Sequence, residues 1–240
     1  LENMEDTDTT TTEPIYWKIL LDEIDFENVG FALNMPQDSL FVRTMLPKTT
    51  LKDGVIDLKE ASYYVKSFDM DNAELAYGPK EELSLKKIGL QLDSIYYCGR
   101  DIRANIEEFV FKERSGLELV STEGRIASDS VLIQIPKFTM KTTASSLDLQ
   151  TKIGWDVLEM KKTGVLSAKI NAEIGKGDVA KILGGRDTLF LQTYPNKPFV
   201  FRADAEGDLK RLRLRTLEAG LAKAFELKAE GNLLHLTDST

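Results

Sequence analysis

The side chains that could do covalent or acid–base chemistry in this chain are few and far apart. His235, in "NLLHLTD", is the only histidine, so a histidine-based triad would depend on it, and a metal site with several histidine ligands is excluded. Cys98, in "IYYCGRD", is the only cysteine, so no intrachain disulfide can form. Only Arg100 is close enough in sequence to activate its thiol. We interpret both residues as structural.

Acidic residues offer no better site. The segment "DEIDFEN" (22–28) holds several carboxylates, and paired carboxylates can hydrolyse glycosidic bonds, but strand alternation places Asp22 and Glu23 on opposite faces. Residues 69–80 begin like a calcium loop, yet they carry Glu74 where glycine is needed and Lys80 where glutamate is needed. We therefore expect no catalytic residue, no metal site and no cofactor, and predict that the protein is not an enzyme.

The composition is that of a globular protein with an acidic surface. The 240 residues are 42% hydrophobic and 29% charged, with a net charge of −8. Lysines and arginines are scattered, which argues against binding nucleic acid or resting on an anionic membrane surface. The longest uncharged stretch, residues 28–37, is about half of the roughly 20 residues that a spanning helix needs. We expect an acidic, threonine-rich arm at 1–14 and a single elongated β domain at 15–240, together a fragment of a larger protein.

Hydrophobic periodicity indicates an all-β fold. Between residues 17 and 35 apolar residues alternate, but the phase slips after Leu21 and again after Phe26, which indicates a bulge or turn at each slip. The rest of the chain predicts many short strands separated by turn residues, which favours an antiparallel sheet. Examples are 40–46 and 55–58, 62–68 and 73–77, 117–121 and 125–128, 131–135 and 138–142, and 189–193.

At most one or two short helices are expected. In "GKGDVAKILGG" (175–185) the spacing predicts a helix at 178–184, with Asp178 capping its first amides and Gly184 ending it. Residues 209–227 can be drawn as a helix, but the alternation favours two strands joined near Ala219–Gly220.

The remaining feature is a set of apolar residues that alternation places on one face of the predicted sheet. Such a face is either the core of a sandwich, covered by a second sheet, or a partly open groove that accepts acyl chains. The candidate residues are Leu33, Val42, Leu92, Ile106, Phe138, Met140, Ile170, Phe199, Phe201, Leu212, Leu214, Phe225 and Leu227.

Two segments resemble a known family. "GDLKRLRLRTLEAGLAKAFELKAEGNLLHLTD" (207–238) is similar to the glycine–strand–strand–glycine–strand unit that recurs in TamB-like and AsmA-like proteins, and "VLSAKINAEIGKGDVAKIL" (165–183) resembles their strand followed by a short helix. Residues 17–42 and 115–149 are similar in style to TamB-like proteins of Bacteroidetes. The residues that fill the repeated phrase are Gly207, Leu209, Leu212, Leu214, Phe225, Leu227, Ala229, Gly231, Leu233, Leu236 and Asp238.

The resemblance implies a long antiparallel sheet folded lengthwise into a trough with an apolar interior. It implies a periplasmic location, with an inner-membrane anchor outside this fragment and no membrane span within it. The expected ligands are phospholipid acyl chains, and outer-membrane assembly proteins are possible partners. The implied function is a non-enzymatic scaffold for intermembrane phospholipid transport and outer-membrane biogenesis. The alternatives are a surface adhesion or carbohydrate-binding β module and, third, a glycan-processing enzyme.

Overall fold

The protein is one antiparallel sheet. The structure is a computed structural model that describes residues 16–35, 37, 40–78, 80, 82–159, 164–184, 186 and 188–234. In these residues twelve strands pair in sequence order, each with its neighbours in the chain, so the predicted all-β class is confirmed. The arm expected at 1–14 and His235 lie outside the described residues. The strands are β1 (Lys18–Met35), β2 (Leu40–Asp57), β3 (Ser62–Tyr77), β4 (Leu83–Cys98), β5 (Asp101–Glu113), β6 (Glu118–Ser128), β7 (Leu132–Thr142), β8 (Ser146–Gly154), β9 (Leu166–Ile174), β10 (Phe199–Gly207), β11 (Arg211–Leu221) and β12 (Phe225–Leu234).

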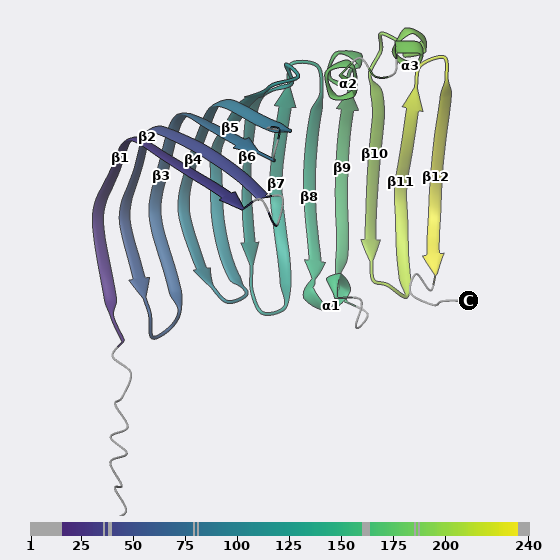
Figure 1. Cartoon of the computed structure of the whole chain (residues 1–240). Helices are drawn as coiled ribbons and strands as arrows, with labels where there is room; N and C mark the ends of the chain where they lie inside the picture. The colour runs from purple at the N-terminus through teal and green to yellow at the C-terminus, as the bar shows by residue number, and fades with distance from the viewer. Residues whose placement is uncertain are drawn as a thin grey trace, which may run out of the picture.

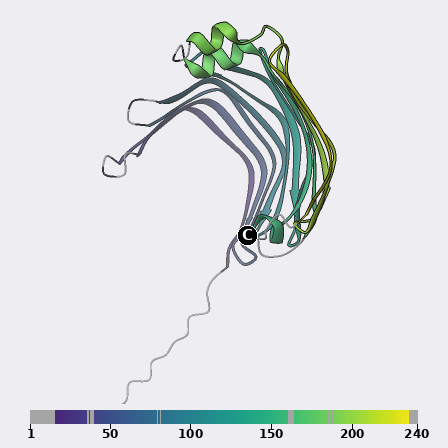
Figure 2. The same cartoon turned by 90° about the vertical axis from the view of Figure 1, so that its right-hand side faces the viewer.

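The sheet is curled into a trough, and its strands differ in length. β1 and β2 have 18 residues each, whereas β8, β9 and β10 have nine. The extra length of the first strands arches over one face of the sheet, and we call this arched part the hood (Figures 1 and 2). Seen along the strand order, the sheet has a C-shaped cross-section that is open on one side (Figure 2).

The arch begins where left-handed residues interrupt the strands. Asn28, Asn72 and Lys87 have φ of 54°, 55° and 52° inside β1, β3 and β4. The β1–β2 pairing skips the position of Asn28 opposite Pro47. A single left-handed residue bends a strand and shifts its side-chain phase, and asparagine tolerates this conformation better than most residues. Interruptions at matching positions of neighbouring strands therefore bend the sheet as a unit.

The strands are longer than predicted. The pairs expected at 40–46 and 55–58, and at 62–68 and 73–77, are each one continuous strand, β2 and β3. The pairs expected at 117–121 and 125–128, and at 131–135 and 138–142, are likewise one continuous strand each, β6 and β7. The phase slips predicted at 21–24 and 26–29 do occur, within β1. Residues that normally mark turns, such as Pro47, here lie within strands, and the prediction of many short strands was wrong for that reason.

Three short helices lie at the ends of strands in the part of the chain that the structure describes. The helix predicted at 178–184 is α2 (Lys176–Leu183), and Gly184, with φ of 56°, ends it as expected. α1 (Trp155–Leu158) and α3 (Thr188–Thr193) exceed the one or two helices predicted. α3 replaces the strand expected at 189–193, because six residues are too few for periodicity to separate helix from strand.

No second sheet is present in the described part of the chain, so the sandwich interpretation of the apolar face was wrong. The two-strand interpretation of 209–227 was correct, although the strands join at residues 222–224 and not near Ala219–Gly220. None of the helices among the described residues is long and apolar enough to cross a membrane.

Candidate apolar groove

The strand register divides the sheet into an apolar inner face and a polar outer face. One row of paired residues runs across β4 to β11 on the inner face. In each strand, the residues directly before and after this row have their side chains on the outer face. The inner row is Leu92, Ile106, Gly124, Phe138, Leu149, Ile170, Ala203 and Leu217.

The phase slips keep apolar side chains on the inner face of the long strands. A Cβ added at Gly54 would stand 3.2 Å from the Leu21 Cβ and 3.2 Å from a Leu51 methyl. Residues 51 and 54 are an odd number apart, yet they share a face because Asp53 between them has φ of 50°. In β1 the inner positions change in the same way from Leu21 to Ile24, which pairs with Leu51. The slips therefore bend the sheet without turning charged residues into the trough.

All thirteen candidate residues fall on the inner face by this register. Leu33 pairs with Val42 in the hood. Leu212 and Leu214 pair with Leu233 and Gly231 near the opposite edge of the sheet. Four of the others lie in the inner row named above: Leu92, Ile106, Phe138 and Ile170. The next inner row, two residues along each strand, contains Met140, Phe201 and Leu227. Phe199 and Phe225 lie two residues further along their strands, and their rings are 6.3 Å apart.

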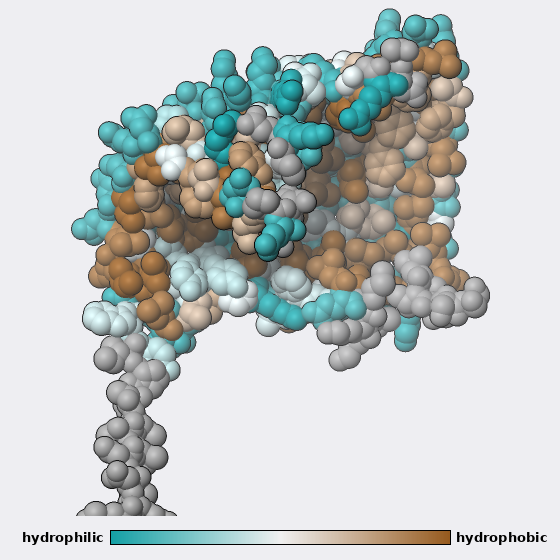
Figure 3. Space-filling model, viewed as in Figure 1, coloured by the Kyte–Doolittle hydropathy of each residue, from teal (hydrophilic) through white to brown (hydrophobic). Residues whose placement is uncertain are grey.

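The inner face is open to solvent. No large side chain in the described part of the chain is fully buried, and the buried apolar residues there are few: Ala73, Ala76, Ile88, Leu119, Val157, Tyr194 and Leu209. Phe31, Phe225 and Leu227 are 55%, 52% and 49% exposed. The space-filling view shows apolar surface lining the hollow under the hood and continuing across the later strands (Figure 3). An exposed apolar surface of this continuity usually marks a binding site.

The outer face is polar and carries ion pairs between neighbouring strands. Lys52 lies 2.9 Å from Glu23, and Lys66 lies 3.0 Å from Asp53. All four side chains are about half exposed or more, so these pairs add little stability. They keep the outer face soluble while the inner face stays apolar.

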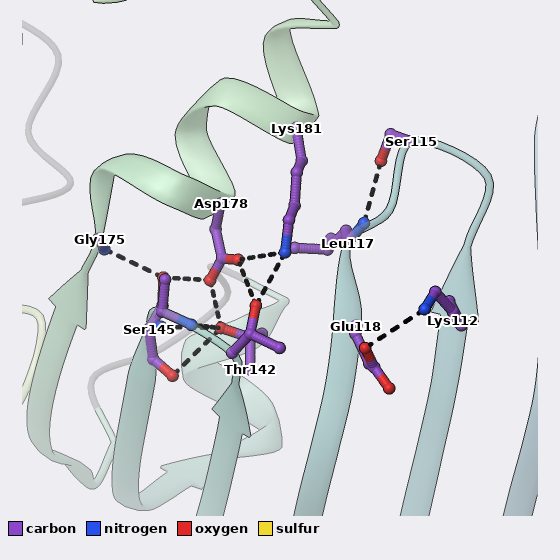
Figure 4. A network of polar contacts seen from close by, with 11 residues as sticks. Lys112, Ser115, Leu117, Glu118, Thr142, Ser145, Gly175, Asp178 and Lys181 are labelled. Atoms are coloured by element: carbon purple, nitrogen blue, oxygen red, sulfur yellow. Dashed lines mark hydrogen bonds and ion pairs between the residues drawn. The ribbon is translucent and has the colours of Figure 1, made fainter.

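α2 is fixed over the β7–β8 turn by Asp178 (Figure 4). The residue is 2% exposed, and its carboxylate accepts hydrogen bonds from the Thr142 and Ser145 hydroxyls, the latter at 2.6 Å. Burial alone would raise the pKa of Asp178, but these hydrogen bonds and the charge of Lys181, 3.7 Å away, outweigh it and lower the pKa. Asp178 does not cap α2 as predicted, since Gly175 is the N-cap.

Two threonines on the inner face were missed by the sequence analysis. Thr49 and Thr122 are each 2% exposed, and neither hydroxyl has a hydrogen-bond partner within the described part of the chain. Thr49 pairs with Met70 and Thr122 with Met140, so both stand in apolar rows. Leaving a hydroxyl unpaired costs about 1–3 kcal/mol. The signal in the sequence was a threonine at an otherwise apolar alternating position.

The residues considered for catalysis do not converge. Glu23 is taken up by its ion pair with Lys52, and the Cys98 thiol donates to the Glu60 carbonyl at 3.4 Å. Among the described residues no group of three or more histidines, cysteines or carboxylates is placed to hold a metal ion. The inner face is therefore the principal candidate site.

Comparisons of the chain with models of protein families, with curated proteins and with solved structures find no match. The family resemblance thus stays a prediction from the sequence pattern.

Proposed function

We propose that the trough is a groove that shelters the acyl chains of lipids, and that the protein is a non-enzymatic segment of an intermembrane lipid-handling scaffold in the periplasm. The observation that carries this proposal is the uncovered inner face, which no second sheet covers in the described structure and on which the thirteen candidate residues are half-buried or, in the edge strand β12, exposed. Outer-membrane biogenesis, and contact with outer-membrane assembly proteins, belong to the same proposal through the family resemblance.

Hydrocarbon suits such a face energetically. Burial of each methylene contributes about 0.8 kcal/mol, and the inner rows offer apolar contacts along the whole width of the sheet, from Leu33 in the hood to Leu227 in β12. Hydrocarbon binding needs no directed polar group. This agrees with the finding that the reactive side chains among the described residues do not converge on one site.

The test is whether the purified chain carries lipid. Native mass spectrometry and solvent extraction should detect bound phospholipid after expression in a bacterial host. Replacing Leu212 and Leu214 together with aspartate should reduce that lipid severalfold while circular dichroism still reports the sheet. Arg213→Asp changes the net charge equally, but from the outer face between them, and should leave lipid unchanged. Lipid-free wild-type protein, or equal loss in both variants, would refute the proposal.

A carbohydrate-binding module is the second candidate, favoured by one observation on the outer face. Tyr64 pairs with Tyr96 across β3 and β4, and the Arg103 guanidinium lies 4.6 Å from the Tyr96 ring centre. The register places Tyr64 and Tyr96 opposite each other on neighbouring strands. Glycan binding that is lost in Tyr64→Ala would support this alternative over the groove.

A further inference from the structure

A lysine-lined hollow lies at the upper end of the groove, next to the last two strands. It measures about 690 Å³ and lies between the start of α2, the segment from α3 to β10, and the β11–β12 turn. We call it the crest hollow; α2 and α3 mark its position in Figure 1. Its charged lining residues are Lys176, Lys197 and Lys223, with the polar Gln192 and Asn196 beside them.

The crest hollow concentrates positive charge in an acidic protein. The chain has 39 acidic and 31 basic residues, yet no carboxylate is among the described residues that line this hollow. Lys197 and Lys223 make no ion pair within the described part of the chain, and the Lys176 ammonium donates to the Tyr194 carbonyl at 2.8 Å. Three ammonium groups around one hollow repel each other unless an anion lies between them.

A second hollow on the outer face shares two of these lysines. It also measures about 690 Å³ and lies over Gly220, whose missing side chain leaves space. The carboxylates there, Glu218 and Glu226, are already paired with Arg202 at 3.1 Å and Lys228 at 2.6 Å. They therefore do not neutralise Lys197 and Lys223.

Apolar surface begins directly beside the crest hollow. Phe225 follows the β11–β12 turn on the inner face and is 52% exposed, and its ring lies 6.3 Å from that of Phe199. Leu227 continues the same face two residues later. Positive charge at the crest and apolar surface immediately below it match the two ends of an anionic amphiphile.

The geometry points to the crest hollow as the binding site for the anionic headgroup of an amphiphile whose acyl chain lies on the inner face at Phe199, Phe225 and Leu227. This inference rests on the proposed groove and adds the ligand's charge and orientation to it. Phosphate, carboxylate and sulfate headgroups share the required chemistry. Lys197 and Lys223 supply the charge, and the β11–β12 turn separates headgroup from chain.

The test compares amphiphiles with the same chain. Isothermal titration of the whole chain with dodecyl phosphate and with uncharged dodecyl maltoside should show about tenfold tighter binding of the phosphate, as expected for a few exposed charge contacts, and the preference should shrink in high salt. Lys197→Gln combined with Lys223→Gln should abolish the preference and keep maltoside binding. Lys59→Gln combined with Lys210→Gln, at the other end of the strands, should preserve it.

The outcomes separate the two proposals. If neither amphiphile binds, the groove itself is wrong. If both bind equally, or the Lys197 and Lys223 variant keeps the preference, the groove stands and the headgroup site is overturned. Inorganic phosphate that binds as tightly as dodecyl phosphate would also overturn it, because the hollow would then be a site for free anions.

Discussion

Replacing Leu227 with alanine distinguishes a groove from a covered core. The side chain is 49% exposed, and full burial of a leucine is worth about 1.5–3 kcal/mol. About half of that, about 1 kcal/mol, is already realised in the folded chain, and a similar amount remains for a ligand. Leu227→Ala should therefore lower the free energy of unfolding by about 1 kcal/mol, whereas a core leucine would cost about 2–5 kcal/mol.

The same substitution should weaken hydrocarbon binding. A loss of about 1 kcal/mol of ligand contact corresponds to about a fivefold higher Kd. Urea unfolding followed by circular dichroism measures the stability, and titration with a fluorescent fatty acid measures the affinity. Glu226→Ala is the matched control, because Glu226 precedes Leu227 on the outer face and its ion pair is with Lys228. It should change neither quantity appreciably.

Two results would refute this reasoning. A stability loss of about 4 kcal/mol with unchanged affinity would mean that Leu227 belongs to a covered core. Equal weakening of fatty-acid binding by Glu226→Ala would mean that the ligand does not lie on the inner face.

Three further substitutions test the parts that hold the trough together. Asp178→Asn removes a buried charge that accepts several hydrogen bonds and should cost about 2 kcal/mol. Because the pKa of Asp178 is lowered in the folded chain, its contribution is present above the ordinary aspartate pKa of about 3.9 and is lost as the pH falls through the lower folded value; acid unfolding of the variant should lack that component. Gly175→Ala would place a Cβ 2.2 Å from the Ala144 carbonyl oxygen, so chemical denaturation should show a loss of about 1–3 kcal/mol. Thr122→Val removes the unpaired hydroxyl and should raise the thermal midpoint, and a lowered midpoint would mean that this hydroxyl has a partner.

The inner face could be predicted from the sequence because its signal is local. Alternation at Phe199 and Phe201, or at Leu212 and Leu214, depends only on the two-residue period of a strand. The phase slip after Phe26 was visible for the same reason, and Asn28 is the residue that makes it. Residue type and spacing were therefore enough to predict which of these side chains share a face.

The arch of the sheet could not be predicted because it depends on the alignment of interruptions between strands. Asn72 in β3 and Lys87 in β4 bend the sheet together with Asn28, but nothing in the sequence shows that the three positions are aligned. The strand expected at 40–46 stops just before Pro47, a residue that normally interrupts strands, although Pro47 lies inside β2. The crest hollow was missed on similar grounds, since Lys176 and Lys223 are 47 residues apart in sequence and only the fold brings them together.

A single curved sheet gives a last prediction about stability. In a sandwich the second sheet covers the apolar face. Here no second sheet does so in the described part of the chain, and Phe31 and Phe225 on the two edge strands stay about half exposed. A hydrocarbon ligand would supply the missing contacts, and it would bind the folded sheet but not the unfolded chain. At about 100-fold excess over Kd it should stabilise by about 2.7 kcal/mol, which corresponds to about 5–10 °C in Tm for a chain of this size. Differential scanning fluorimetry with a saturating fatty acid measures this shift, and an unchanged Tm would show that hydrocarbon does not complete the fold.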